Sequence, residues 1–185
     1  MSAHVLVLGG SRSGKTGFAE RLAIRGGERP LYLATAVALD EEMRERVRLH
    51  QAQRPGRFST LEEPLELAAA LRSAAKSHDV VLVDCLTLWI TNMLGANRDV
   101  AKGVSDLLAV LSGIDTCRVI LVSNEVGLGI VPDNALARTF RDLAGSAHQR
   151  LAEICEEVHF VVAGLPMTLK GPRLTESTTE LPRPE

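Results

Sequence analysis

The 185-residue chain is poor in aromatic residues and has no excess of positive charge, and both scarcities limit what it can bind. Phe, Trp and Tyr make up 3% of the sequence, too little for a protein that recognises single-stranded nucleic acid by stacking bases on aromatic rings. The 21 Lys and Arg residues are outnumbered by 23 Asp and Glu, which leaves a formal net charge of −2. Because a nucleic-acid backbone is bound through a basic surface, we expect no nucleic-acid partner.

Cysteines and long apolar segments are also scarce. Cys85, Cys117 and Cys155 lie far apart and include no Cys-x-x-Cys pair, so we expect small buried side chains in a reducing compartment, not a disulfide framework or a zinc site. The longest apolar run, residues 80–90, is too short to cross a bilayer and is interrupted by Asp84. The first residues show no basic region followed by an apolar stretch. We therefore expect no secretory signal, no membrane span and a cytoplasmic protein.

What the sequence has is a high apolar content, 45%, and apolar strands that alternate with helical segments. The alternation predicts an α/β fold, a mostly parallel sheet with helices on both faces, in a single domain over residues 1–170. We expect strands at residues 4–8, 31–34, 80–84, 118–123 and 159–163. Helices are expected at residues 15–25, 40–53, 65–76, 86–94, 100–111 and 134–157. Residues 171–185, rich in Pro, Thr and Glu, are predicted to form a flexible tail.

A P-loop motif follows the first expected strand. Residues 9–16 read Gly-Gly-Ser-Arg-Ser-Gly-Lys-Thr and match the pattern Gly-x4-Gly-Lys-Ser/Thr, with a helix predicted after it. Backbone N–H groups of such a loop hold phosphate oxygens, and the helix adds its positive end. The predicted phosphate-binding residues are Gly9, Gly10, Ser11, Arg12, Ser13, Gly14, Lys15 and Thr16. The motif predicts a P-loop NTPase with a RecA-like sheet; a plain Gly/Ser turn is the alternative.

Three side chains complete the predicted phosphate site. Lys15 can reach the β- and γ-phosphates of a nucleoside triphosphate, and the Thr16 hydroxyl can ligate Mg²⁺. The apolar strand at residues 80–84 ends in Asp84, and a cation explains a carboxylate at the end of a core strand. Asp84 can alternatively cap the following helix, and the two roles can coexist.

The expected helix at residues 40–53 carries a histidine and an arginine on one face. Met43, Val47, His50 and Arg54 are spaced by four, three and four residues. Side chains at the spacing of His50 and Arg54 can converge on one phosphate. A histidine on an apolar face is more often a core residue, so the spacing alone leaves both roles open.

Six segments together make the chain recognisable. They are residues 9–16, Tyr-Leu-Ala-Thr-Ala at 32–36, His-Gln-Ala-Gln-Arg-Pro at 50–55, Thr-Leu-Glu-Glu-Pro at 60–64, Asp-Cys-Leu-Thr at 84–87, and Asn-Glu-Val-Gly-Leu-Gly-Ile-Val-Pro at 124–132. In this order they resemble the bifunctional adenosylcobinamide kinase/adenosylcobinamide-phosphate guanylyltransferase family of cobalamin biosynthesis, from the P-loop to about residue 165. Two positions depart from the family: Phe58 stands where Trp is common, and His148 precedes Gln149 where an Asn-Gln pair is expected.

The resemblance implies two consecutive reactions. ATP or GTP phosphorylates the hydroxyl of adenosylcobinamide, and GTP then transfers GMP to that phosphate and releases pyrophosphate. His50 would carry GMP covalently between the two halves of the second reaction. Beyond the P-loop, the family's nucleotide contacts correspond to Ala34, Thr35, Ala36, Gln51, Ala52, Gln53, Arg54, Glu62 and Asp84. The resemblance also implies a homotrimer, with His50 near a loop of a neighbouring subunit.

The implied chemistry suits these side chains. Much of the histidine is a neutral nucleophile at pH 7, and covalent catalysis divides one difficult transfer into two easier ones. Arg54 can neutralise charge that develops at the α-phosphate. Glu62 can accept a hydrogen bond from the guanine edge or from ribose. Residues 124–132 are either a tight turn or an active-site or corrinoid-side loop, because Glu125 follows a strand end, where ligands bind in open α/β sheets.

The sequence is also compatible with two rival functions. A simple small-molecule kinase would move only the γ-phosphate and would use His50 structurally. A non-catalytic switch would use GTP to order a loop, but a guanine-specific switch would be expected to carry an Asn-Lys-x-Asp motif, which this sequence lacks. The two rivals predict no covalent nucleotide on the protein.

Overall fold

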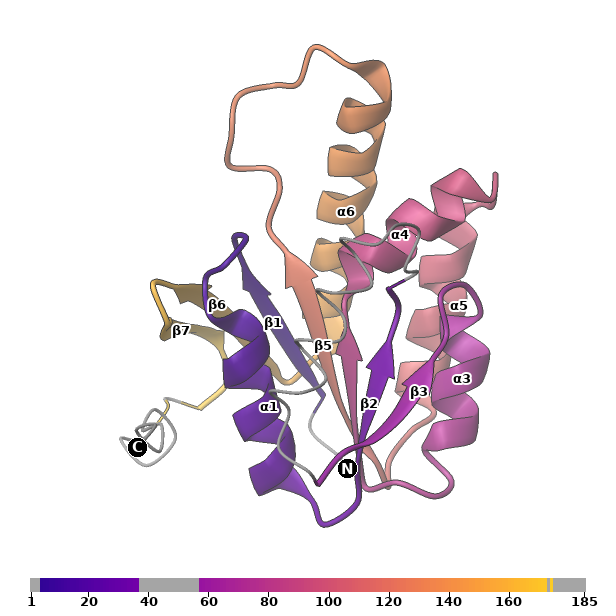
Figure 1. Ribbon diagram of the computed structural model, residues 1–185, viewed down its shortest axis with the longest axis vertical. Coiled ribbons are helices and arrows are strands. Elements are labelled where there is room, and N and C mark those ends of the chain that lie inside the picture. Colours follow the sequence, from indigo (N-terminus) through magenta and orange to yellow (C-terminus); the bar gives the residue numbers. More distant parts are fainter. Residues whose placement is uncertain (1–3, 37–56, 173, 175–185) are drawn as a thin grey trace.

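The computed structural model describes residues 4–36, 57–172 and 174, and these form one seven-stranded sheet covered by helices (Figure 1). The expected helix at residues 40–53 lies outside the described residues. The strand order is β3-β2-β4-β5-β1-β6-β7, and every neighbouring pair is parallel except β6 with β7. The strands are β1 (Val5–Gly9), β2 (Pro30–Ala34), β3 (Ser59–Glu62), β4 (Val80–Asp84), β5 (Arg118–Asn124), β6 (Glu157–Val162) and β7 (Leu165–Lys170).

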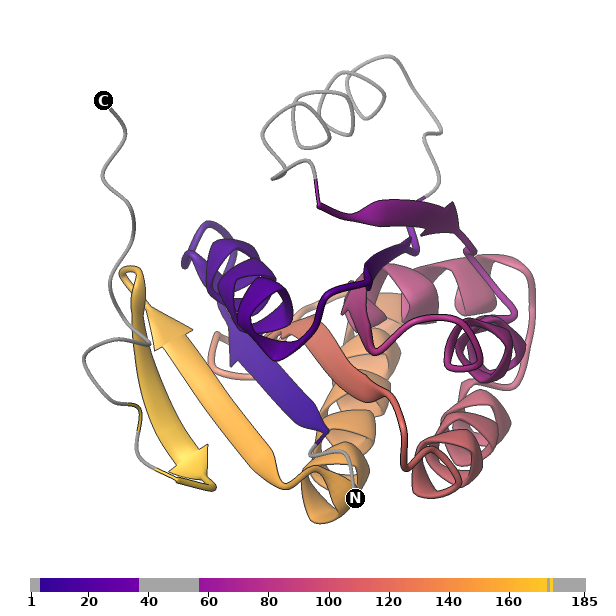
Figure 2. The same cartoon turned by 90° about the horizontal axis from the view of Figure 1, so that it is seen from below.

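Helices cover both faces of the sheet, as the alternating pattern predicts (Figure 2). On one face lies α1 (Lys15–Gly26); on the other lie α3 (Leu67–Ala74), α4 (Leu86–Gly95), α5 (Val100–Ser112) and α6 (Ala135–Ile154). Successive side chains of a strand point to opposite faces. Val5 and Val7 of β1 therefore pack with Phe18 of α1, whereas Leu6 and Leu8 join the larger apolar cluster on the other side. The predicted fold class is confirmed.

The structure adds two strands that the sequence pattern does not predict, and both are at the edges of the sheet. All four residues of β3 are exposed, so the strand has no buried apolar face to reveal it. β7 follows β6 through a turn at Ala163 and Gly164 and exposes its apolar side chains. Edge strands bury little surface, so their pairing depends on the neighbouring strand more than on their own sequence.

The last predicted helix is three residues too long at its C-terminal end. α6 ends at Ile154, and the amides of Glu156 and Glu157 donate to the His4 carbonyl at 3.1 and 3.2 Å. The chain therefore leaves the helix to begin β6, which pairs with β1. Leu174, inside the predicted tail, packs against the α1-side cluster.

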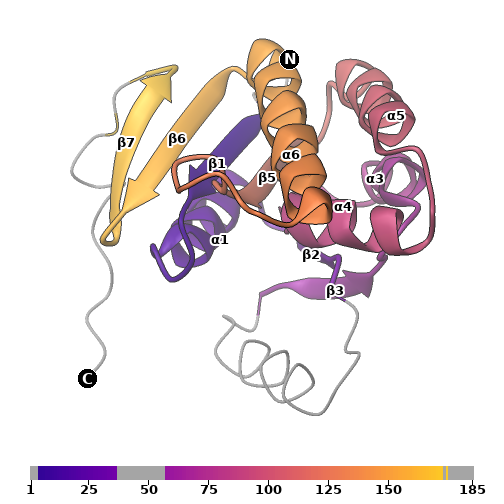
Figure 3. The ribbon, with the colours of Figure 1, turned by 90° about the horizontal axis from the view of Figure 1, so that it is seen from above.

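The parallel strands place their carboxyl ends along one edge of the sheet, onto which Figure 3 looks. The segments that follow β1, β2, β3, β4 and β5 meet at this edge, and they contain most of the predicted site residues. Among the described residues, none of the helices is both long and apolar enough to span a bilayer.

Candidate functional site

The P-loop joins β1 to α1 and provides no side-chain cap for the first amides of the helix. The N-cap of α1 is Gly14, at φ +89°, and it has no side chain to accept from those amides. A Cβ on Gly9 would lie 2.6 Å from both Ser13 Oγ and Val161 O, so only glycine fits there. Unpaired amides at the positive end of a helix bind phosphate.

Backbone contacts hold the loop in this shape. The Gly164 amide donates to the Ser13 carbonyl at 2.8 Å, which ties the β6–β7 turn to the loop. Lys15 Nζ donates to the Gly10 carbonyl at 3.1 Å, and the Lys15 side chain is mostly buried. Burial lowers the pKa of Lys15, and the charge of Asp84 opposes that shift. Within the described part of the chain, Ser13 Oγ is a buried atom with no hydrogen-bond partner, so the loop is polar and incompletely satisfied.

Asp84, at the end of β4, faces the start of α1. Its Oδ2 accepts hydrogen bonds from Thr16 Oγ1 at 3.3 Å and from the Tyr32 hydroxyl at 2.5 Å. The Phe58 ring packs edge-on against Tyr32, with centroids 6.0 Å apart. The capping alternative for Asp84 is wrong, because the N-cap of α4 is Cys85, the next residue. The carboxylate is instead aimed at the phosphate loop.

The ends of β2 and β3 continue the same edge. Thr35 is fully buried: its amide donates to the Asp84 carbonyl, and its hydroxyl bonds to both the carbonyl and the amide of Cys85. Thr35 therefore holds β2 against the end of β4, and its side chain is not free for a ligand. Ala34 is in register with Glu62, and Glu62 is exposed at the end of β3. Ala36 is half-buried.

A third group of polar side chains lies at the end of β5. The Glu125 amide donates to the Gly9 carbonyl at 3.0 Å, and Glu125 Oε1 accepts from the Gly127 amide. His148 of α6 is buried; its Nε2 lies 2.7 Å from Ser123 Oγ and its Nδ1 lies 3.7 Å from Glu125 Oε2. Burial lowers the pKa of His148, although Glu125 acts in the opposite direction.

The predicted site residues thus fall into two groups. The structure gathers the P-loop residues, Ala34, Thr35, Ala36, Glu62 and Asp84 at one edge of the sheet. His50, Gln51, Ala52, Gln53 and Arg54 lie outside the described residues. The sequence motifs did not predict that Tyr32 bonds to Asp84 or that Gly164 bonds to Ser13. For Tyr32 there was a signal, because a tyrosine hydroxyl in an otherwise apolar strand indicates a polar partner close by.

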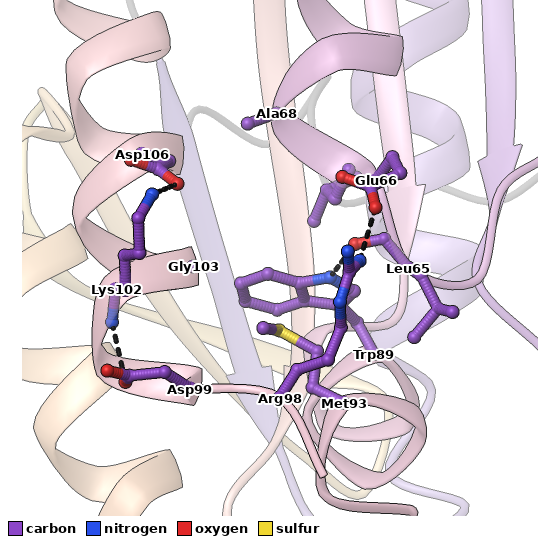
Figure 4. Close-up of a pocket in the computed structure, with 11 residues that line it drawn as sticks. Leu65, Glu66, Ala68, Trp89, Met93, Arg98, Asp99, Lys102, Gly103 and Asp106 are labelled. Carbon is purple, nitrogen blue, oxygen red and sulfur yellow. Dashed lines mark hydrogen bonds and ion pairs between the residues drawn. The ribbon is translucent and has the colours of Figure 1, made fainter. Parts of the chain in front are cut away.

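A cavity of about 260 Å³ lies among α3, α4 and α5, and no predicted site residue lines it (Figure 4). The buried Trp89 forms one wall, and its Nε1 donates to the Leu65 carbonyl at 2.9 Å. Ion pairs of Arg98 with Glu66 and of Lys102 with Asp106 stand at its rim. None of the residues that line the cavity belongs to the phosphate loop.

The parallel sheet and the loop with Lys15, Thr16 and Asp84 define a P-loop nucleoside triphosphate-binding protein. The chain is similar in fold to the assembled ATPase EscN of the enteropathogenic E. coli type III secretion system, with a TM-score of 0.56 over 88% of this chain and 43% of that chain, at 8% identity. This likeness supports the fold alone.

The family follows from the sequence comparisons. The model of the family described as cobinamide kinase / cobinamide phosphate guanyltransferase matches residues 5–169, and the chain belongs to this family. It is 53% identical over 167 residues to the bifunctional adenosylcobalamin biosynthesis protein CobP of Pseudomonas aeruginosa, with 90% of this chain and 96% of that protein covered. It is 38% identical to the bifunctional adenosylcobalamin biosynthesis protein CobU of Salmonella typhimurium, with 90% and 99% covered. The chain is therefore a bifunctional kinase and guanyltransferase of adenosylcobalamin biosynthesis.

Proposed function

We propose that the enzyme phosphorylates the hydroxyl of adenosylcobinamide with ATP or GTP and then transfers GMP from GTP to that phosphate through a guanylyl-histidine at His50. The observation that carries this proposal is the convergence of the P-loop, Lys15, and the Thr16–Asp84 pair at the edge that also carries Glu62. The products are adenosylcobinamide-GDP and pyrophosphate.

Mg²⁺ fits the residues at this edge. The Asp84 carboxylate and the Thr16 hydroxyl are hard oxygen donors 3.3 Å apart, and Mg²⁺ at nucleotide sites uses one or two such ligands together with phosphate oxygens and waters. When bound, Mg²⁺ would neutralise charge on the phosphates.

The nucleotide can extend from the loop towards β3. Asp84 of β4 and Glu62 of β3 are separated by β2, so they lie two strand spacings, roughly 10 Å, apart. That length suits a nucleoside with its phosphates at Thr16 and Lys15 and its base or ribose at Glu62. Between them, Ala34 is buried in the α1-side cluster and Ala36 is half-buried, so no large side chain of these two residues stands in the nucleoside's path.

The two reactions use the phosphate loop differently. In the kinase step, Lys15 and the loop amides stabilise charge on the γ-phosphate as it moves to the acceptor. In the transferase step, His50 attacks the α-phosphorus with a neutral imidazole nitrogen, the bond from that phosphorus to the bridging oxygen breaks, and the loop holds the leaving pyrophosphate. The phosphate of the acceptor then displaces the histidine. Arg54, together with Gln51, Ala52 and Gln53, would bind the nucleotide near His50.

Labelling tests this function directly. Incubation with GTP labelled at the α-phosphorus, followed by denaturation, should leave acid-labile, base-stable label on the protein. We expect His50→Ala to lose the label and guanylyl transfer but to keep phosphorylation of adenosylcobinamide, and Lys15→Ala to weaken both reactions. Label that persists in His50→Ala would exclude His50 as the nucleophile, and the absence of label in the unaltered protein would favour the simple kinase.

We also propose that the enzyme works as a cytoplasmic homotrimer, with His50 near a loop of a neighbouring subunit. Light scattering on the purified protein should give three times the 20.0 kDa mass of one chain. A monomeric mass at working concentration would contradict this assembly.

A further inference from the structure

Ser123, Glu125 and His148, the polar side chains at the end of β5, have no part in the nucleotide chemistry described above. They nevertheless lie beside the phosphate loop. β5 lies between β1 and β4, the strands that carry the P-loop and Asp84. The Glu125 amide bonds to the carbonyl of Gly9, and Lys15 Nζ bonds to the carbonyl of Gly10, the next residue. The backbone of Glu125 and the amine of Lys15 thus contact adjacent carbonyls of the same loop.

The Glu125 carboxylate is held in place but still reaches solvent. Oε1 accepts from the Gly127 amide, Oε2 faces His148, and the side chain is 20% exposed. A carboxylate that is fixed by its neighbours and open on one side can accept a proton from a bound molecule.

The loop beyond Glu125 is strongly apolar on its outside. Leu128, Ile130 and Val131 are 81%, 97% and 59% exposed, and the loop rises above the carboxyl edge of the sheet (Figure 1). Next to it, α4 and α6 enclose an apolar cavity of about 480 Å³ lined by Leu94, Leu136 and Phe140 among others. Exposed apolar groups of this extent mark a binding surface, and the family's acceptor is a large molecule that needs one.

We propose that Glu125 is the general base of the kinase step and that His148 is its positioning residue. The assignment rests on the proposed function, because it needs an acceptor hydroxyl beside the γ-phosphate. The hydroxyl proton passes to the Glu125 carboxylate, the freed oxygen bonds to the γ-phosphorus, and the bond from that phosphorus to the β–γ bridging oxygen breaks. A nucleoside diphosphate leaves with that electron pair.

His148 faces the base with a buried nitrogen. If Nε2 accepts the Ser123 hydroxyl hydrogen, Nδ1 carries its own hydrogen and directs it towards Glu125 Oε2, 3.7 Å away. Nδ1 is buried, with no hydrogen-bond partner among the described residues, so Glu125 is the group towards which it is aimed. At 3.7 Å the attraction between the two groups is electrostatic, and it orients the carboxylate without occupying Oε2 by a hydrogen bond.

The two activities of the enzyme give a sharp test. The kinase acceptor is a hydroxyl that must lose a proton, whereas the acceptor of GMP is already a phosphate anion. We expect Glu125→Gln to lower kcat of adenosylcobinamide phosphorylation by about 10²-fold to 10⁴-fold, the usual contribution of a general base. Guanylyl transfer to pre-formed adenosylcobinamide phosphate should continue. Asp133→Asn, which removes an exposed carboxylate from the same loop, is the matched control and should leave both activities in place.

His148 is tested with a pair of substitutions. We expect His148→Leu to lower the kinase kcat by about 10-fold to 100-fold, the cost of a misplaced catalytic group, and His148→Gln, which keeps a donor, to restore most of it. Guanylyl transfer should survive in both variants, whereas a merely structural role would reduce both reactions. Loss of both reactions in a folded Glu125→Gln protein, or full kinase activity in it, would overturn the assignment. If the unaltered enzyme phosphorylates no cobinamide at all, the proposed function fails instead.

Discussion

Thr16 and Asp84 are 68 residues apart in the chain, and the Thr16 hydroxyl donates a hydrogen bond to Asp84 Oδ2 at 3.3 Å. The contact brings the start of α1 over the end of β4, across the intervening strand β5. It places two oxygen donors suited to Mg²⁺ at the mouth of an anion-binding loop.

Asp84→Asn should lower both reactions by about 10²-fold or more, because the amide keeps an oxygen for Thr16 and Tyr32 but loses the charge that would hold Mg²⁺. Steady-state rates across a Mg²⁺ titration measure the effect. Asp106→Asn, in an exposed pair with Lys102, serves as the control and should behave as the unaltered enzyme does. An Asp84→Asn enzyme with normal rates at low Mg²⁺ would rule out Asp84 as a metal ligand.

Tyr32→Phe should weaken Mg²⁺ binding by about tenfold, because the hydroxyl that orients the Asp84 carboxylate from 2.5 Å is lost. The free energy of unfolding should fall by about 0.5–1.5 kcal/mol, the net value of one buried hydrogen bond. The edge-on contact with Phe58 remains in the variant, so packing is preserved. The concentration of Mg²⁺ that gives half-maximal rate is the measurement, and no change in it would contradict the orienting role.

Gly9→Ala and Gly10→Ala should differ sharply in stability. A Cβ at Gly9 would lie 2.6 Å from Ser13 Oγ and from the Val161 carbonyl, whereas at Gly10 nothing lies within 4 Å. Gly9→Ala should therefore destabilise the protein by about 1–3 kcal/mol, the usual cost of overpacking, and Gly10→Ala by much less. Denaturant unfolding followed by fluorescence of the single, buried Trp89 measures both. Equal stability of the two variants would contradict the close approach of β6 to the loop.

The three cysteines should resist thiol reagents in the folded protein at pH 8. Burial raises the pKa of Cys117 to about 11 and of Cys155 to about 12, and burial together with the charge of Asp84 raises the pKa of Cys85. A colorimetric disulfide reagent should detect three thiols only after denaturation. Rapid reaction of any thiol in the native protein would contradict this.

The same cysteines predict that the free energy of unfolding falls as the pH rises into the alkaline range. The pKa of Cys117 and Cys155 in the folded protein lies above the ordinary value of 9.0, so the unfolded chain releases those protons first as the pH rises. Their contribution to stability is complete below pH 9 and is lost as the pH approaches 11 to 12. Cys155→Ala should therefore reduce the slope of unfolding free energy against pH in this window.

The accuracy of the sequence-based predictions depended on how local each feature is. The core strands and the helices of the described residues were predicted because each buries an apolar pattern of its own, as β1 and β4 do. β3 and β7 were missed because edge strands are formed by pairing with a neighbour. The capping role considered for Asp84 was wrong because the carboxylate turns towards Thr16 and Tyr32, which are far away in sequence.

The sequence by itself determined that this protein has a phosphate loop and belongs to its enzyme family, because eight consecutive residues and a few spaced segments encode both. Only the tertiary structure decided what surrounds that loop. The order of the strands places β5 between β1 and β4, which brings Glu125 and His148 to the loop, and places β6 on the other side of β1, which allows Gly164 to hold Ser13. No local pattern specifies these contacts, since they arise from packing between segments that are distant along the chain.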